Sequence, residues 1–303
     1  MDIVKEIQTL KAERNAVILA HNYQLPEIQD IADYNGDSLG LSIEASKTKA
    51  DVIVFCGVSF MAETAKIISP SKTVLLPAPD AGCPMADMIT ADQLRALKAQ
   101  HPGAKVMCYV NSSAEVKAEC DLCCTSANAS FVATKAFAPD QEIIFVPDKH
   151  LANYTAKDTG RKFIIHPGFC PTHNRILPEH VKAARVAHPH AEVLVHPECS
   201  LAVIAEADKA LSTGGMGTYV PKSSATEFII GTEEGMVYRL QKDNPTKKFY
   251  PLLPGVMICP NMKKTTLEKV YLSLKEMKHR VEVPADIAAK ARGAIMRMIE
   301  LST

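Results

Sequence analysis

The strongest constraint on the fold of this chain is an internal repeat of about 88 residues. Three of the nine cysteines are followed directly by proline, namely Cys83, Cys170 and Cys259, and they are spaced by 87 and 89 residues. Because roughly one residue in twenty is proline, nine cysteines would give about half a Cys-Pro pair by chance. A period near 88 is too long for a solenoid repeat. The spacing therefore predicts three copies of one small α/β unit.

Polar residues recur with nearly the same period in each predicted unit. The residues that end the first strand are Asn22, Asn111 and Glu198, spaced by 89 and 87 residues. The hydroxyl residues at the following predicted helix start are Ser38, Ser126 and Thr213, spaced by 88 and 87 residues. Each unit is therefore expected to run through a strand, a polar strand end, a hydroxyl, a second strand and the Cys-Pro pair.

Short apolar runs alternate with helical patterns along the whole chain. Strands are predicted at residues 16–20, 52–55, 74–76, 106–110, 143–146, 163–165, 193–195, 228–230 and 256–258. Helices are predicted at residues 26–33, 40–49, 91–98, 127–136, 178–187 and 267–278. Strands separated by helices favour parallel sheets, and continuous apolar strands suit sheets that are covered on both faces. We expect units at residues 1–103, 104–190 and 191–303, the last with additional C-terminal helices.

Charge and hydropathy exclude several classes of protein. The 34 Lys and Arg residues balance 34 Asp and Glu residues, whereas a nucleic-acid-binding protein usually carries a basic excess. The longest apolar stretch is shorter than the roughly 18 residues that a membrane span needs. The charged N-terminus lacks the apolar core of a signal peptide, so we expect a cytoplasmic protein without nucleic-acid or membrane partners. In a reducing compartment a disulfide framework is not expected.

Three similar units pack most simply around a pseudo-threefold axis, which would bring the three Cys-Pro loops together. Structural zinc normally takes four protein ligands, and catalytic zinc usually has mixed ligands, so three thiolates favour a [4Fe–4S] cluster with one open iron. The alternative is that these cysteines fill the core. Core or loop positions are also expected for the Cys120-x-x-Cys123 pair and adjacent Cys124. The remaining cysteines, expected to be buried in or beside strands, are Cys56, Cys108 and Cys199.

Polar side chains at matched strand ends predict a ligand-binding cleft at the centre. The strand-end residues are His21, Tyr23, Tyr109, Asn111, His196 and Glu198. A single such residue is more often a turn former, and the hydroxyls of Ser38, Ser126 and Thr213 could cap helices. Capping and anion binding are compatible, because helix N-termini attract carboxylates and phosphates. The pattern therefore predicts a small substrate with several negative charges.

The sequence closely resembles the quinolinate synthase (NadA) family over essentially its whole length. The segments that carry the resemblance are AHNYQLPEIQDIAD with GDSL, GVSFMAETAKI, CPMAD, YVNSSAEVKA, CTSANA, CPTH, HPEC, STGGM, IGTEEGM and CPNMKKTTLE. The resemblance implies three three-layer α/β/α units around a pseudo-threefold axis, with the active site at the centre. It also implies a [4Fe–4S] cluster that is held by Cys83, Cys170 and Cys259.

The resemblance further implies that iminoaspartate (iminosuccinate) and dihydroxyacetone phosphate condense to quinolinate, with loss of phosphate and water. The implied substrate-binding residues are His21, Ser38, Tyr109, Val110, Asn111, Ser126, His196, Pro197, Glu198 and Thr213. The implied catalytic residues are Tyr23, Glu198, His196 and His173. Some members place extra cysteines just after the third ligand, whereas Pro260, Asn261 and Met262 follow Cys259 here, which excludes a local regulatory disulfide.

Two other classes of function stay open at this stage. One is a different three-cysteine cluster enzyme on a tripled scaffold, such as a radical enzyme like those of diphthamide synthesis. The other is a metal or metabolite sensor without turnover. If the chain makes quinolinate, a transient contact with the enzyme that produces labile iminoaspartate is consistent with the chemistry.

Overall fold

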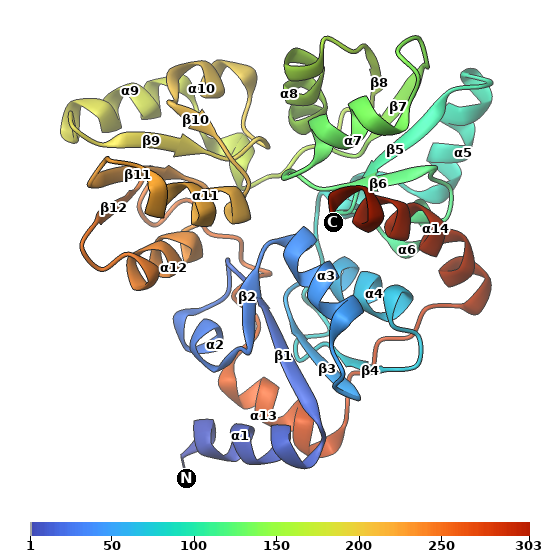
Figure 1. Cartoon of the computed structure of the whole chain (residues 1–303), viewed down its shortest axis with the longest axis vertical. Coiled ribbons are helices and arrows are strands. Elements are labelled where there is room, and N and C mark those ends of the chain that lie inside the picture. The colour runs from blue at the N-terminus through green and yellow to red at the C-terminus, as the bar shows by residue number, and fades with distance from the viewer. Residues whose placement is uncertain (1) are drawn as a thin grey trace.

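A computed structural model describes residues 2–303 and contains three four-stranded parallel sheets. Within residues 2–303 the strand orders are β2-β1-β3-β4, β6-β5-β7-β8 and β10-β9-β11-β12. All three sheets therefore have the same order of second, first, third and fourth strand. The three sheets and their helices form lobes around a common centre (Figure 1). The expected fold class, three α/β/α units with parallel sheets, is confirmed.

The first unit contains β1 (Ala16–His21), β2 (Tyr34–Gly36), β3 (Val52–Cys56) and β4 (Thr73–Leu75). Its helices are α1 (Ile3–Glu13), α2 (Pro26–Ile31), α3 (Ser38–Lys47) and α4 (Ser59–Ile68). Every residue of β3 is buried, which explains its uninterrupted apolar sequence.

The second unit contains β5 (Lys105–Tyr109), β6 (Leu122–Cys124), β7 (Ile143–Val146) and β8 (Phe163–Ile165). Its helices are α5 (Ala91–Gln100), α6 (Ala114–Lys117), α7 (Ala129–Ala136) and α8 (Lys149–Thr159), and a 3₁₀ turn (Ala86–Met88) precedes them. The α5 helix begins with a capping box, in which Thr90 and Gln93 each satisfy the other's backbone N–H.

The third unit contains β9 (Glu192–Val195), β10 (Lys209–Ala210), β11 (Glu227–Gly231) and β12 (Lys248–Pro251). Its helices are α9 (Pro178–Ala187), α10 (Leu201–Glu206), α11 (Thr213–Tyr219) and α12 (Gly235–Asp243), with 3₁₀ turns at His173–Arg175 and Val220–Lys222. Two further helices, α13 (Leu267–Glu276) and α14 (Ala285–Ser302), follow this sheet in the chain.

The two last helices leave the third unit and pack on the other two. Helix α13 lies against α1 below the first sheet, whereas α14 lies beside β6, α6 and α4 (Figure 1). The guanidinium of Arg292 in α14 donates to the last carbonyls of α4, which joins this helix to the first unit. Helices α5 and α9 contact α6 and α10, so they are described with the second and third sheets although they precede residues 103 and 190, and the division at those residues stays a prediction.

One equivalent hydrogen bond is present at the amino end of the sheet in each of the three units. Its residues are spaced with the period found in the sequence. In each unit an aspartate in the turn before the second strand accepts a backbone N–H near the start of the first strand. The pairs are Asp33 with Ile18 at 2.8 Å, Asp121 with Val106 at 2.8 Å, and Asp208 with Val193 at 2.7 Å. The three units therefore share local chemistry as well as strand order.

Eight of the nine predicted strands coincide with observed strands, but the prediction at residues 256–258 is wrong. These residues form a turn after Pro254 and Gly255, whose positive φ of 73° breaks the extended backbone. The segment is apolar because Met257 packs in the core of the third unit. Among residues 2–303, no helix combines the length and apolar character needed to cross a bilayer.

Candidate active site

A central cavity lies where the three units meet, with about 700 Å³ of empty space including its mouth. It is lined by residues that follow the strands of all three sheets, as expected for the carboxyl ends of parallel strands. The predicted site residues that line it are His21, Tyr23, Ser38, Tyr109, Asn111, Ser126, His173, His196, Glu198 and Thr213, together with Cys83, Cys170 and Cys259. The structure therefore brings together residues that are up to 238 positions apart in the sequence.

Two of the predicted substrate-binding residues do not line this cavity. Val110 is buried and lines a small neighbouring cavity with Ser38 and Phe60, and its N–H already donates to the carbonyl of Cys124. Pro197 lies between His196 and Glu198, has no N–H to offer, and is not part of the lining.

The buried carboxylate of Glu198 is the main hydrogen-bond acceptor of the site. The Tyr109 hydroxyl donates to Oε1 at 2.5 Å, and Nδ1 of His173 lies 2.7 Å from Oε2. The Cys170 thiol lies 3.1 Å from the same Nδ1 atom. The ring of His173 also stacks on that of His196, with 4.7 Å between centroids. These contacts connect a cysteine of the second unit to a carboxylate of the third.

These contacts separate the pKa values of the two acidic groups. Burial alone would raise the pKa of Glu198, but the imidazoles of His196 and His173 and the Tyr109 hydroxyl hold that pKa below its ordinary value. Burial and the Glu198 charge raise the pKa of Tyr109 well above its usual range. At neutral pH, Glu198 is therefore a carboxylate and Tyr109 a neutral hydrogen-bond donor.

His21 and His196 have the same local geometry in the first and third units. The backbone N–H of Tyr23 donates to Nδ1 of His21, and that of Glu198 donates to Nδ1 of His196, both at 3.2 Å. Burial is the largest cause that lowers the pKa of each histidine to about 3. Because Nδ1 accepts in a neutral ring, the proton is on Nε2, which in His196 faces the Ser126 hydroxyl at 3.1 Å. Both rings can thus donate a hydrogen bond without carrying a charge.

This shared geometry also adjusts the alignment of the repeat by one residue. The matched N–H bonds make Tyr23, rather than Asn22, the counterpart of Glu198, and the spacing from Tyr23 to Asn111 is 88 residues. Asn22 is not part of the cavity lining, and its amide instead donates to the hydroxyl of Thr213, which does line the cavity, at 3.0 Å. The buried Oδ1 atom of Asn111 has no hydrogen-bond partner among residues 2–303, so it can accept a bond from a ligand.

The repeated hydroxyls are not helix caps. Helix α3 is capped by the Asp37 side chain and α11 by the Ser212 side chain, each one residue before Ser38 and Thr213. In the second unit the Asn128 side chain accepts from Thr125 one residue before Ser126. The hydroxyls are therefore not used for capping, although all three line the cavity.

Cys83, Cys170 and Cys259 are partly buried free thiols, one from each Cys-Pro loop. In every loop, the backbone N–H of the residue three positions later favours the thiolate and so acts to lower the pKa of the cysteine, and these residues are Ala86, His173 and Met262. Burial nevertheless raises the pKa of Cys83 to about 12, raises that of Cys170 well above its ordinary value, and raises that of Cys259. Such thiols lose their protons when a thiophilic metal binds, and N–H groups aimed at sulfur stabilise the resulting thiolates.

A second metal-ligand group overlaps this set. The Cys170, His173 and Glu198 ligand atoms lie within 4.8 Å of one another. Their mutual contacts at 2.7 and 3.1 Å already satisfy His173, so the group is also explained as a hydrogen-bond network.

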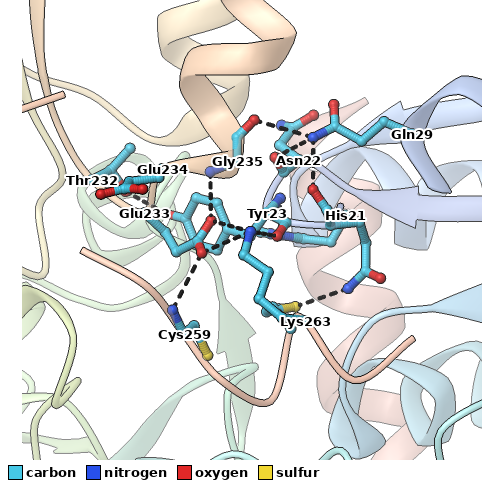
Figure 2. Close-up of polar contacts among 12 residues, drawn as sticks. His21, Asn22, Tyr23, Gln29, Thr232, Glu233, Glu234, Gly235, Cys259 and Lys263 are labelled. Carbon is cyan, nitrogen blue, oxygen red and sulfur yellow. Dashed lines mark hydrogen bonds and ion pairs between the residues drawn. The ribbon is translucent and has the colours of Figure 1, made fainter. Parts of the chain in front are cut away.

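Several site residues were missed by the sequence analysis. Asp37 lines the cavity and accepts a hydrogen bond from Ser212 of the third unit at 3.3 Å. Thr232 joins the Tyr23 hydroxyl, at 2.5 Å, to Nε2 of His173, at 2.8 Å. Glu233 and Lys263 form a buried ion pair of 2.8 Å beside Cys259 (Figure 2). All four lie in or next to the GDSL, IGTEEGM and CPNMKK segments, but no repeat marks them individually.

The other cysteines lie away from the cavity lining. Cys123 and Cys124 are buried in β6, and Cys108 is buried opposite Cys123 in β5. Cys120 is partly buried in the turn before β6, and its thiol donates to the Val116 carbonyl at 3.0 Å. Cys56 and Cys199 are also fully buried, so the expectation of core or loop positions is confirmed.

The fold and site together define an enzyme class in which three α/β units enclose a cavity with three cysteines and a buried His-Glu-Tyr network. A family model described as "Quinolinate synthetase A protein" matches residues 5–300. A quinolinate synthase of Geobacter metallireducens is 54% identical over 99% of this chain and 97% of its own length. Relatives of the same name from Alkaliphilus metalliredigens and Methanoregula boonei are 54% and 53% identical, over at least 97% of their lengths. The chain belongs to the quinolinate synthase family.

Proposed function

We propose that this enzyme condenses iminoaspartate (iminosuccinate) with dihydroxyacetone phosphate to form quinolinate, phosphate and water in de novo NAD biosynthesis. The observation that carries the proposal is the cavity itself, which collects one cysteine from each unit next to the polar strand ends of all three sheets. Full-length similarity to proteins named quinolinate synthase supports the same reaction.

We propose Cys83, Cys170 and Cys259 as the ligands of a [4Fe–4S] cluster. Three thiols, one from each unit, that line a single cavity suit such a cluster, as does the apolar lining around them. The apolar residues are Val58, Phe60, Met61, Met85 and Met262. When bound, the cluster would supply one open iron as a Lewis acid for substrate oxygen atoms.

The other residues have two kinds of proposed role. Neutral His21 and His196 would donate Nε2–H bonds to substrate oxygens, and Ser38, Ser126 and Thr213 would add hydroxyl donors for the carboxylates and phosphate. Tyr109 and Asn111 would complete this set, while Val110 and Pro197 would act only through their backbone carbonyls.

Condensation, isomerisation, imine closure and dehydration all require proton transfers. Glu198 is the leading proposed proton-transfer group, because its carboxylate lines the cavity and contacts both Tyr109 and His173. Tyr23 is the second proposed proton-transfer group, because it lines the cavity and its hydroxyl is joined through Thr232 to His173. His196, with a pKa lowered to about 3, is better suited to donating a hydrogen bond than to accepting a proton.

Replacing each cysteine separately by alanine in protein made anaerobically tests this proposal. We expect each of the variants Cys83→Ala, Cys170→Ala and Cys259→Ala to lose most of its iron and sulfide and all measurable quinolinate formation. The matched control is Cys199→Ala, a buried cysteine of the third unit outside the cavity lining. Survival of both the brown colour and turnover in a ligand variant would rule out the cluster.

We further propose a cytoplasmic location without nucleic-acid or membrane partners, and the balanced charge supports the absence of a nucleic-acid partner. A transient contact with the enzyme that supplies iminoaspartate would protect this labile substrate from hydrolysis. Mixing the two proteins and measuring whether quinolinate forms faster than from free diffusing iminoaspartate would test that contact.

A further inference from the structure

The three Cys-Pro loops are attached to their sheets by the same backbone hydrogen bond. In each unit, the third residue after the third strand donates its N–H to the carbonyl two residues before the cysteine. The pairs are Ser59 with Ala81 at 2.8 Å, Lys149 with Gly168 at 2.8 Å, and Glu234 with Met257 at 2.9 Å. This bond shows which residues occupy equivalent positions around each cysteine.

The residue just before each of these donors is not the same in the three units. It is Asp148 in the second unit and Glu233 in the third, and both are fully buried. Asp148 accepts the backbone N–H of Cys170 at 3.2 Å, and Glu233 accepts that of Cys259 at 3.2 Å. The equivalent residue of the first unit is Val58, which has no acceptor to offer Cys83.

Each carboxylate also has a second anchor that fixes its position. Oδ1 of Asp148 caps α8 by accepting the N–H of Leu151 at 2.7 Å. Oε2 of Glu233 accepts the N–H of Gly235 at 2.8 Å. Glu233 also pairs with Lys263, whose Nζ atom donates to the Tyr23 carbonyl at 2.5 Å (Figure 2). The Cys259 loop is thereby tied to the first unit as well as to its own sheet.

The turn itself does not require a carboxylate, since Val58 occupies it in the first unit. Burying a carboxylate costs stability unless hydrogen bonds compensate, so an acid at this position calls for a role beyond forming the turn. A buried carboxyl oxygen that accepts an N–H holds the donor in place, because breaking the bond would leave a buried polar group without a partner. In both acidic units the donor is the N–H of a cluster cysteine.

We propose that Asp148 and Glu233 are positioning residues that hold Cys170 and Cys259 in place for the cluster, whereas the Cys83 loop is held without a side-chain acceptor. The inference rests on the proposed function, because it takes these cysteines as ligands. Neither carboxylate acts on substrate in this role. Among residues 2–303, Cys83 is the one of the three cysteines whose N–H has no side-chain acceptor.

The test uses Asp148→Asn and Glu233→Gln in the full chain. An asparagine keeps the α8 cap through Oδ1 and replaces the acceptor of the Cys170 N–H by a donor. The matched controls are Asp121→Asn and Asp208→Asn, which remove the same kind of carboxylate-to-N–H bond at the opposite ends of the same two sheets. Anaerobic iron release to a ferrous chelator is measured in all four reconstituted variants, with circular dichroism to verify folding.

We expect iron to leave Asp148→Asn and Glu233→Gln about tenfold faster than wild type, and to leave both controls at the wild-type rate. Wild-type release rates in the two test variants would overturn the inference. Equal acceleration in all four variants would also overturn it, since this would show a general effect of stability.

Hydrogen exchange of the metal-free protein separates this inference from the proposed function. The amides of Cys170 and Cys259 should exchange more slowly than that of Cys83, and each should lose protection in its own variant. Unchanged exchange would refute the tethers even if the enzyme makes quinolinate. A wild-type protein that binds no iron would refute the proposed function, while the exchange data would still decide whether the carboxylates hold the loops.

Discussion

At the scale of single residues, Glu198 is the group on which the polar network of the cavity depends. Its two oxygens accept from Tyr109 and His173, and a glutamine could accept only one of these bonds while its amide nitrogen faced the other donor. We expect Glu198→Gln to lower turnover by about 10² to 10⁴, the usual contribution of a proton-transfer group, with iron content unchanged. Glu192→Gln is the control, because Glu192 begins β9, accepts hydrogen bonds from Tyr219 and Ser223, and is absent from the cavity lining. Normal turnover with an intact cluster would remove Glu198 as a proton carrier.

The two neutral histidines predict a dependence of stability on pH. A histidine with an unfolded pKa near 6.5 and a folded pKa of about 3 takes up a proton only on unfolding within this range, so acid favours the unfolded chain. Each of His21 and His196 should therefore lower the free energy of unfolding by about 2 kcal/mol between pH 7 and pH 5. Urea unfolding at both pH values measures the loss, and His196→Gln should reduce it. Equal stability at pH 7 and pH 5 would contradict the assignment.

At the scale of elements, the start of α12 limits how closely the first and third units approach. A Cβ atom on Gly235 would lie 2.8 Å from the Tyr23 backbone and 2.9 Å from the Glu233 carboxylate. We expect Gly235→Ala to destabilise the protein by about 1–3 kcal/mol and to weaken iron retention. Gly293→Ala in α14, where a Cβ would meet no atom within 4 Å, is the control and should be neutral or stabilising. Unaltered unfolding of Gly235→Ala would show that the units can move apart without cost.

Elements also show where prediction from the sequence succeeds. Strands such as β3 and β7 were predictable because they are buried on both faces and read as apolar runs. The second strand of each unit was missed, and these strands are Tyr34–Gly36, Leu122–Cys124 and Lys209–Ala210. Unlike the equally short β4 and β8, which contain the apolar pairs Val74-Leu75 and Ile164-Ile165, these segments show no β-branched apolar run. Such short strands are fixed by pairing with the first strand, which is a tertiary effect.

At the scale of the whole molecule, the repeat predicted the three units and placed the three cysteines and the polar strand ends in one cavity. It could not identify Lys263 or Asp37, because Lys263 contacts the Tyr23 carbonyl and Asp37 contacts Ser212, each in another unit. It did not reveal Glu233, because the equivalent positions of the other units hold two different residues, Val58 and Asp148. A repeat reveals what the units share, whereas the asymmetric residues between units become apparent only when the units are assembled.

The packing of α13 against α1 has a consequence for the order of folding. Ile7 of α1 and Val270 and Leu274 of α13 belong to one buried cluster that covers the first sheet. More than 250 residues of chain separate the two sides of this contact. Contacts of such long sequence separation form late, because the intervening loop must close first. The first unit is synthesised first, but α13, which covers one of its apolar faces, is synthesised only after all three sheets. This face therefore stays exposed longest during synthesis, which makes the first unit the most prone to aggregation.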